Sequence, residues 1–142
     1  MKSSFYVIAL ATLVAAASLT QAHAQTKVST FDVPFAFAFS GEHLSAGTYT
    51  ITIRGADFLA LSNHAKSDTH FAMIQSSTDL RSTNTQASLI FWKYGDTYLL
   101  AGYSTKGTKL MLIAKKKERS LAREFAANQT EPQPIQLAAR EK

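Results

Sequence analysis

The fold is decided by the stretch TYTITIR, residues 48–54, in which polar and apolar side chains alternate without interruption. Successive side chains of a β-strand point to opposite faces of the sheet, so this pattern is typical of a strand with one buried and one solvated face. Turn elements precede it at Gly41 and at Ser45-Ala46-Gly47. We expect Gly47 to be the residue at positive φ, because a side chain would clash there.

The segment before this strand carries an aromatic row. Val33, Phe35, Phe37 and Phe39 share one parity, with small alanines between the rings. The pattern predicts a strand with its aromatic side chains on one face. Pro34 cannot donate to a ladder, so we expect it near the strand start or on an edge.

The segment after the strand predicts several more short strands. They are expected at residues 58–62, 70–75, 87–94, 97–104 and 109–114, with a Ser-, Thr- and Asn-rich loop over 76–86 and a hairpin turn at Gly95-Asp96. The strand at 87–94 is apolar on both parities, so we expect it to be central. The sequence therefore predicts an all-β fold, an antiparallel sandwich or small barrel of seven to eight short strands.

The pattern changes after residue 114. Leu121 and Phe125 are four residues apart with Ala122 beside them, which predicts an amphipathic helix over 115–126. Residues 127–142 are polar and contain prolines, and they predict a flexible tail. The excess of basic residues lies mainly beyond residue 114, so residues 25–114 form one nearly neutral β domain without the basic face that nucleic-acid binding needs.

The first 24 residues have the features of a secretion signal. Lys2 is followed by an apolar run from Phe5 to Leu19, and Ala22-His23-Ala24 matches the small-x-small cleavage rule. We expect a mature chain that starts near Gln25, is periplasmic or secreted, and has no membrane span. The chain contains no cysteine, which excludes disulfides and thiolate chemistry and is compatible with a bacterial periplasm or exterior.

Two motifs in the mature chain resemble those of known proteins. Val33-Pro34-Phe35-Ala36-Phe37 and Leu44-Ser45-Ala46-Gly47-Thr48-Tyr49 resemble the VPFxF strand and LPAGTY-like turn of a group of small exported β-rich proteins common in soil bacteria. Many of these also carry a hairpin like Tyr94 to Tyr98. The resemblance implies a β-rich fold and export, and it implies no mechanism. Ser45 stands where the usual pattern has proline.

One group of side chains suggests metal binding. His64, Asp68 and His70 lie within one predicted loop and the start of the next strand, and imidazole and carboxylate groups are common ligands of divalent ions. The spacing fits no standard zinc motif, and Asp and His in a polar loop also arise from composition alone. The alternative interpretation is a solvated loop without metal.

The aromatic residues suggest a second kind of site. Six of them are candidate ligand contacts, namely Phe35, Phe37, Phe39, Tyr49, Trp92 and Tyr94. If the sheet closed into a barrel, these rings would line a pocket for an apolar ligand. Small barrels usually fill their interiors with side chains, so the favoured interpretation is that the rings form the core.

The sequence contains no recognisable catalytic apparatus. It has no G-x-S-x-G elbow and no Gly-rich phosphate loop, and its aspartates near predicted turns suit local backbone hydrogen bonds. We therefore expect a non-enzymatic binding or envelope-associated structural protein, without a cofactor and with an envelope or extracellular partner that the sequence does not identify. Two alternatives are a carrier of a small apolar ligand in a β-barrel cavity and an extracytoplasmic hydrolase.

Overall fold

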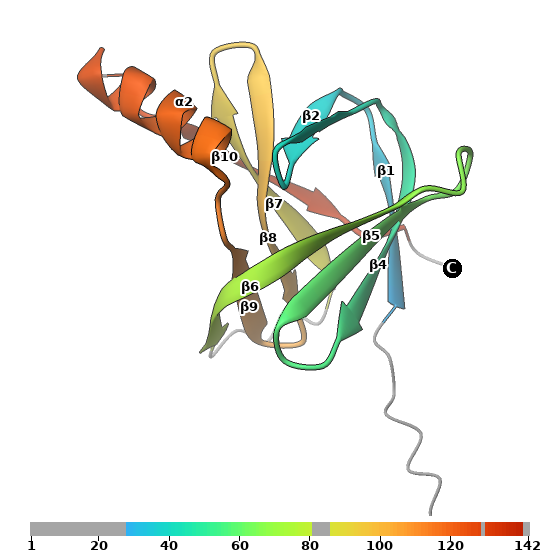
Figure 1. Ribbon diagram of the computed structural model, residues 1–142. Coiled ribbons are helices and arrows are strands. Elements are labelled where there is room, and N and C mark those ends of the chain that lie inside the picture. Colours follow the sequence, from blue (N-terminus) through green and yellow to red (C-terminus); the bar gives the residue numbers. More distant parts are fainter. Residues whose placement is uncertain (1–27, 81–85, 129, 141–142) are drawn as a thin grey trace, which may run out of the picture.

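The computed structural model describes residues 28–80, 86–128 and 130–140 (Figure 1). The expected signal segment lies outside these residues, and so does the middle of the expected loop at 76–86. The described elements are β1 (Val28–Val33), β2 (Phe37–Phe39), β3 (Glu42–Leu44), β4 (Gly47–Arg54), β5 (Phe58–Asn63), β6 (Thr69–Asp79), β7 (Ser88–Tyr94), β8 (Thr97–Thr105), β9 (Thr108–Leu112), α2 (Lys116–Ala127) and β10 (Gln133–Ala138). The predicted all-β fold with a C-terminal helix is confirmed. No helix in the described ranges combines the length and the apolar character needed to cross a membrane.

The strands form one mixed sheet. Its main path is β1-β4-β5-β6-β9-β8, with β7 paired to β8 and β10 paired to β7. β2 also pairs with β8, and β3 pairs with β2. The pairings between described strands are antiparallel except for β2 with β8, where Ala38 is opposite Leu99 in a parallel arrangement. β7 lies between β8 and β10, as expected for a central strand.

β6 connects the two halves of this sheet. Its first part pairs with β5, and the part from Ile74 onward pairs with β9 after a register shift between Ile74 and Ser76. An irregularity of this kind bends a strand and increases its twist. The sheet therefore curves around the core, which Figure 1 shows as the turn from the green strands to the brown ones.

The two ends of the curved sheet approach each other without forming a ladder. Arg140 follows β10, and its backbone N–H donates to the carbonyl oxygen of Thr30 in β1 at 2.8 Å. Its side-chain Nε also lies 3.0 Å from an oxygen of Asp32. These contacts hold the ends together locally, but the sheet is not closed into a barrel. The barrel alternative is therefore not the observed architecture.

The alternation in residues 48–54 produces the core as predicted. Tyr49 and Ile51 are fully buried, and the threonines between them are partly exposed. In the aromatic row Val33, Phe37 and Phe39 are also buried, but the row does not form the single strand that was predicted, because residues 34–36 separate β1 from β2 and Phe35 is only partly buried. Each buried large apolar side chain contributes about 1.5–3 kcal/mol relative to exposure.

Three further local expectations were wrong. Gly47 begins β4 without a positive φ, and Ser40 and Gly41 at the β2–β3 turn take that conformation, at 51° and 85°. The expected loop begins later than predicted, because β6 continues to Asp79 and pairs with β9. The expected flexible tail contains β10, which pairs with β7 from Ser88 to Lys93.

β10 forms because its apolar residues have the period of a strand. Ile135 and Leu137 lie opposite Phe91 and Leu89 and pack against the core. The other edge of β10 pairs with no described strand, so Pro134 is tolerated there. Two prolines and a polar composition hid this pattern at the level of the sequence.

Candidate functional site

Helix α2 lies alongside the β7–β8 hairpin and is anchored to the sheet at its first turn (Figure 1). The Glu118 carboxylate is only 5% exposed. One oxygen accepts a hydrogen bond from the Gly41 backbone N–H at 2.9 Å, and the other accepts one from the Lys115 N–H at 2.6 Å. Glutamate at this position commonly closes the first turn by accepting the N-cap amide, and here it also ties the helix to the β2–β3 turn.

A second contact fixes the far end of the helix. The Phe125 ring packs edge-on against the Tyr94 ring at 5.3 Å between centroids. It also covers Gly95, where a Cβ atom would lie 3.2 Å from the end of the Phe125 ring. Gly95 has a positive φ of 58°, so the hairpin turn favours glycine for its backbone as well as for this contact.

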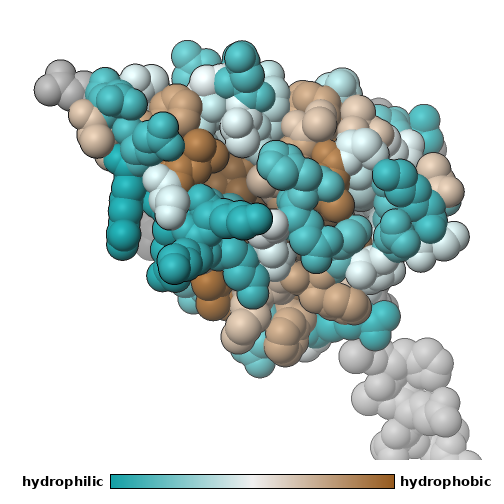
Figure 2. All heavy atoms as spheres, turned by 45° about the horizontal axis from the view of Figure 1, so that its top comes forward, coloured by the Kyte–Doolittle hydropathy of each residue, from teal (hydrophilic) through white to brown (hydrophobic). Residues whose placement is uncertain are grey.

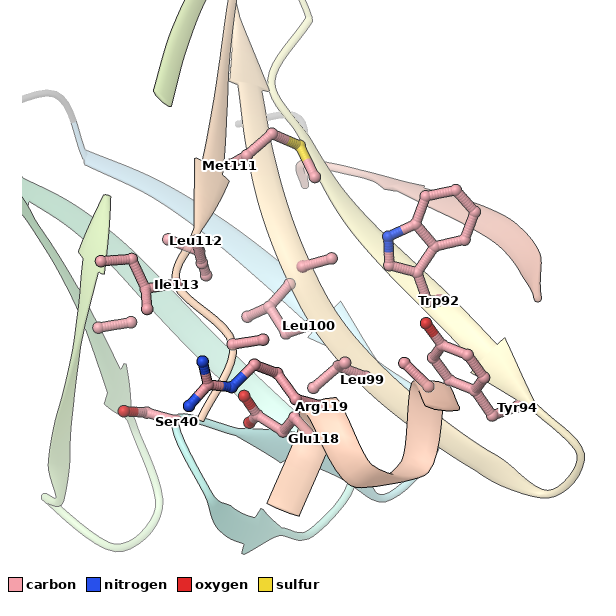
Figure 3. Close-up of a pocket in the computed structure, with 14 residues that line it drawn as sticks. Ser40, Trp92, Tyr94, Leu99, Leu100, Met111, Leu112, Ile113, Glu118 and Arg119 are labelled. Carbon is pink, nitrogen blue, oxygen red and sulfur yellow. The ribbon is translucent and has the colours of Figure 1, made fainter. Parts of the chain in front are cut away.

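Between the two anchors lies a cavity of about 180 Å³. From the sheet it is lined by residues of β7, β8 and β9, mainly Trp92, Leu99, Leu100, Met111 and Leu112. Figure 3 shows these side chains surrounding an open space beneath the helix. A cavity of about 150 Å³ with an apolar lining holds a benzene molecule, so this space suits a group of roughly six to eight non-hydrogen atoms.

The helix covers this space without filling it. Ala122 is the apolar helix residue that lines the cavity between the anchors, and its side chain is a single methyl group. On the other flank of the helix, a second hollow of about 240 Å³ lies beside Leu121 and Lys117. Leu121 and Phe125, which carry the predicted apolar stripe, are only partly buried. The helix therefore rests on its two anchors.

The polar groups of the cavity lie toward the helix side. Glu118 and Arg119 line it from α2, and Ser40 lines it from the end of β2. The Arg119 side chain extends from the helix on the side of the cavity that carries Ser40 (Figure 3). Figure 2 shows hydrophobic surface set between hydrophilic side chains on the face of the molecule that it presents. Such a lining suits a ligand that is mostly apolar with a polar end.

Burial also affects Tyr94 at the edge of the cavity. Its side chain is 8% exposed, and loss of solvation raises the pKa of the phenol above its usual value of 10. Desolvation disfavours the charged form, so the hydroxyl group keeps its proton throughout the physiological range. Tyr94 thus presents a neutral, uncharged wall.

The six predicted aromatic contacts divide into two groups. Phe37, Phe39 and Tyr49 are fully buried in the core, where Phe37 packs edge-on against Tyr49 at 5.3 Å. Phe35 stacks on Tyr98 at 3.9 Å and does not line the cavity. Trp92 and Tyr94 do line it. The structure therefore brings two of the six residues to the candidate site.

The three predicted metal ligands have separate partners. His64 Nε2 contacts Thr50 Oγ1 at 2.5 Å, and His70 Nδ1 lies 2.8 Å from a carboxylate oxygen of Glu42. Asp68 uses its backbone carbonyl to accept the N–H of Asn63 at 2.9 Å. In the described part of the chain, no group of three or more His, Asp or Glu side chains is placed to hold a metal ion. His64, Asp68 and His70 are not brought together.

Sequence reasoning missed most of the cavity. Arg119, Ala122 and Met111 were not recognised, because each needs the position of α2 over the sheet to acquire a role. The available signal was the narrow stripe on the predicted helix, in which Ala122 separates two larger apolar residues. Comparisons of the chain with models of protein families, with curated proteins and with solved structures found no match. The resemblance to small exported soil-bacterial proteins stays a prediction.

Proposed function

We propose that this protein is an exported, non-enzymatic binding protein that holds a small apolar group in the cavity beneath α2. The observation that carries the proposal is the space of about 180 Å³ between a helix held at two points and the apolar face of the sheet. Protein interiors are normally close-packed, so a space of this size with an apolar lining is a candidate binding site.

Export is supported by the sequence of the first 24 residues, and the non-enzymatic assignment by the kind of lining. The walls are predominantly aliphatic and aromatic, and the Glu118 carboxylate is engaged by two backbone amides. A carboxylate held in this way serves the architecture of the site. Export predicts that the protein recovered outside the cytoplasm begins near Gln25, which N-terminal sequencing checks.

The proposed ligand space is not the one that the sequence predicted for a carrier. The expected ligand space was the interior of a barrel, but rings expected to line it pack against one another in the core, with the ring centroids of Phe37 and Tyr49 5.3 Å apart. The space under α2 is lined instead by residues of β7, β8 and β9 together with the helix. A ligand there would lie between the helix and the sheet.

The size of the cavity limits the affinity. Small ligands gain at most about 1.5 kcal/mol per non-hydrogen atom, and ordinary ones much less. A group of about eight atoms at roughly 0.5–0.7 kcal/mol each gives a Kd between about 1 mM and about 80 µM. The natural ligand is expected to bind in this range unless it extends beyond the cavity.

The proposal is tested with the single tryptophan of the chain, because Trp92 lines the cavity. The purified protein is titrated with 1-hexanol while Trp fluorescence is followed. A saturable change with a Kd below a few mM is expected. Ala122→Leu fills the cavity from the helix and should weaken binding about tenfold or more, since a clash in a small pocket costs about 1–3 kcal/mol.

The matched control is Ala126→Leu, the same substitution at an exposed position of the same helix. It should bind 1-hexanol as the parent does. A change in fluorescence that does not saturate, or one that both variants retain equally, would refute the proposed cavity. Far-ultraviolet circular dichroism of both variants confirms that the sheet is intact.

A further inference from the structure

We infer that the ligand is a small amphipathic acid whose anionic group is bound by Arg119 and whose apolar part occupies the cavity beneath α2. This inference rests on the proposed function and names the class of ligand. It starts from the position of one charged group at the boundary of an apolar space. A ligand with both characters would satisfy both parts of the site.

Arg119 is a cation without an ionic partner in the described structure. The ion pairs between described residues join His70 to Glu42 and Arg140 to Asp32. Arg119 nevertheless lines the cavity, and its guanidinium extends beside it (Figure 3). The planar guanidinium presents paired N–H donors that match the two oxygens of a carboxylate.

The neighbouring acid, Glu118, does not compete with an anionic ligand for the Arg119 guanidinium. Glu118 also lines the cavity, but its oxygens accept the N–H groups of Gly41 and Lys115. Around it the chain carries an excess of positive charge, with five bases at Lys115, Lys116, Lys117, Arg119 and Arg123 against the two acids Glu118 and Glu124. The helix dipole adds partial positive charge at the same end. The field at the cavity therefore favours an anion over a cation.

The size of the cavity sets the length of the apolar part. A space of about 180 Å³ takes the hydrocarbon part of a six-carbon chain and leaves the head group at the helix side, where Arg119 lies. The end of a longer hydrocarbon chain would have to extend out of the cavity through its solvent-exposed side. Hexanoate is therefore a suitable probe, with 1-hexanol as its neutral counterpart and hexylamine as its cationic counterpart.

The experiment compares these three probes by Trp92 fluorescence in the parent protein, in Arg119→Gln and in Arg123→Gln. Arg123 is an exposed base on the same helix that does not line the cavity, so it is the matched control. The parent should bind hexanoate more tightly than hexylamine. Arg119 is exposed, so Arg119→Gln should weaken hexanoate binding only about 2- to 5-fold, with 1-hexanol binding unaffected.

The outcomes separate this inference from the proposed function. If none of the probes binds saturably, the proposed cavity itself is wrong. If 1-hexanol binds but hexanoate shows no preference over hexylamine, or if both variants weaken hexanoate equally, the cavity stands and the assignment of Arg119 is overturned. A second measurement needs no variant: added salt should weaken hexanoate binding to the parent and leave 1-hexanol binding unchanged.

Discussion

Replacing Glu118 with glutamine tests the anchor that positions α2 over the cavity. The carboxylate is buried and receives one N–H from the β2–β3 turn and one from the residue before the helix. Glutamine has nearly the same shape, so it creates no void. It offers one oxygen acceptor, and its NH₂ group must then face the second backbone N–H, donor against donor.

The size of the effect follows from these two contacts. Hydrogen bonds to charged groups contribute about 1.5–3 kcal/mol each, and neutral ones about half as much. Losing one and halving the other should cost about 2–4 kcal/mol. The helix makes few other contacts with the sheet, so we expect part of this loss to appear as local release of α2.

Two measurements check this prediction. Urea unfolding followed by circular dichroism gives the loss in free energy of unfolding, and hydrogen exchange reports the amides of Gly41 and Lys115 directly. The control is Glu124→Gln, an exposed glutamate near the end of the same helix, which should change stability by less than about 0.5 kcal/mol. If Glu118→Gln behaves like Glu124→Gln and both amides exchange as in the parent, the anchor does not hold the helix.

Two further predictions concern the sheet beneath the helix. A Cβ atom at Gly102 would lie 2.5 Å from the backbone oxygen of Leu110, so Gly102→Ala should lower the free energy of unfolding in urea by about 2–4 kcal/mol. The control is Gly47→Ala, where the nearest contacts of a Cβ atom lie at 3.8 Å, and it should change this free energy by less than about 1 kcal/mol. Equal losses in the two variants would contradict the close approach of β8 and β9. Because the pKa of Tyr94 is raised in the folded state by burial, its proton is lost first in the unfolded chain, and stability should fall as pH rises above about 10. Tyr94→Phe should reduce this alkaline loss, and identical pH profiles of the two proteins would show that the phenol is not desolvated.

The part of the fold that could be predicted is the part in which local pattern and burial agree. The alternation around Tyr49 and Ile51 specified both the strand and its buried face, because a shift by one residue would expose every apolar side chain. The pair Leu121 and Phe125 specified the helix to within one residue at each end. These features depend on neighbours in the sequence, so they are visible in it.

The missed features depend on contacts between distant segments. β10 has only two apolar residues on its inner face, Ile135 and Leu137, and it is ordered because β7 provides a full-length edge for it. The positive φ at Ser40 and Gly41 belongs to a turn that approaches Glu118, which lies more than 70 residues away in the sequence. Nothing near Gly41 in the sequence indicates that its N–H will bind a carboxylate of the helix.

In the candidate site, too, the sequence predicted some residues and missed others, and the reason is physical. Aromatic residues were expected to mark a ligand space. However, aromatic rings also stabilise the fold most when their large apolar surface is buried, and Phe37, Phe39 and Tyr49 are buried in the core. The cavity arises from the opposite feature, a helix with too narrow an apolar stripe to pack closely against the sheet. That the stripe is too narrow to fill the space beneath it is recognised only when the helix is placed against the sheet.

The two anchors explain how such a helix can still be held in place, and they suggest why the space beneath it persists. Glu118 fixes the first turn through two backbone amides, and Phe125 fixes the last turn against Tyr94, so neither anchor requires the middle of the helix to touch the sheet. Substituting Ala122 by a larger residue would fill the space and gain apolar contacts. A ligand supplies the same contacts reversibly, and by binding the folded state alone it would stabilise the protein by RT ln(1 + [L]/Kd). The docking of α2 and the occupancy of the cavity are therefore expected to be coupled, with each favouring the other.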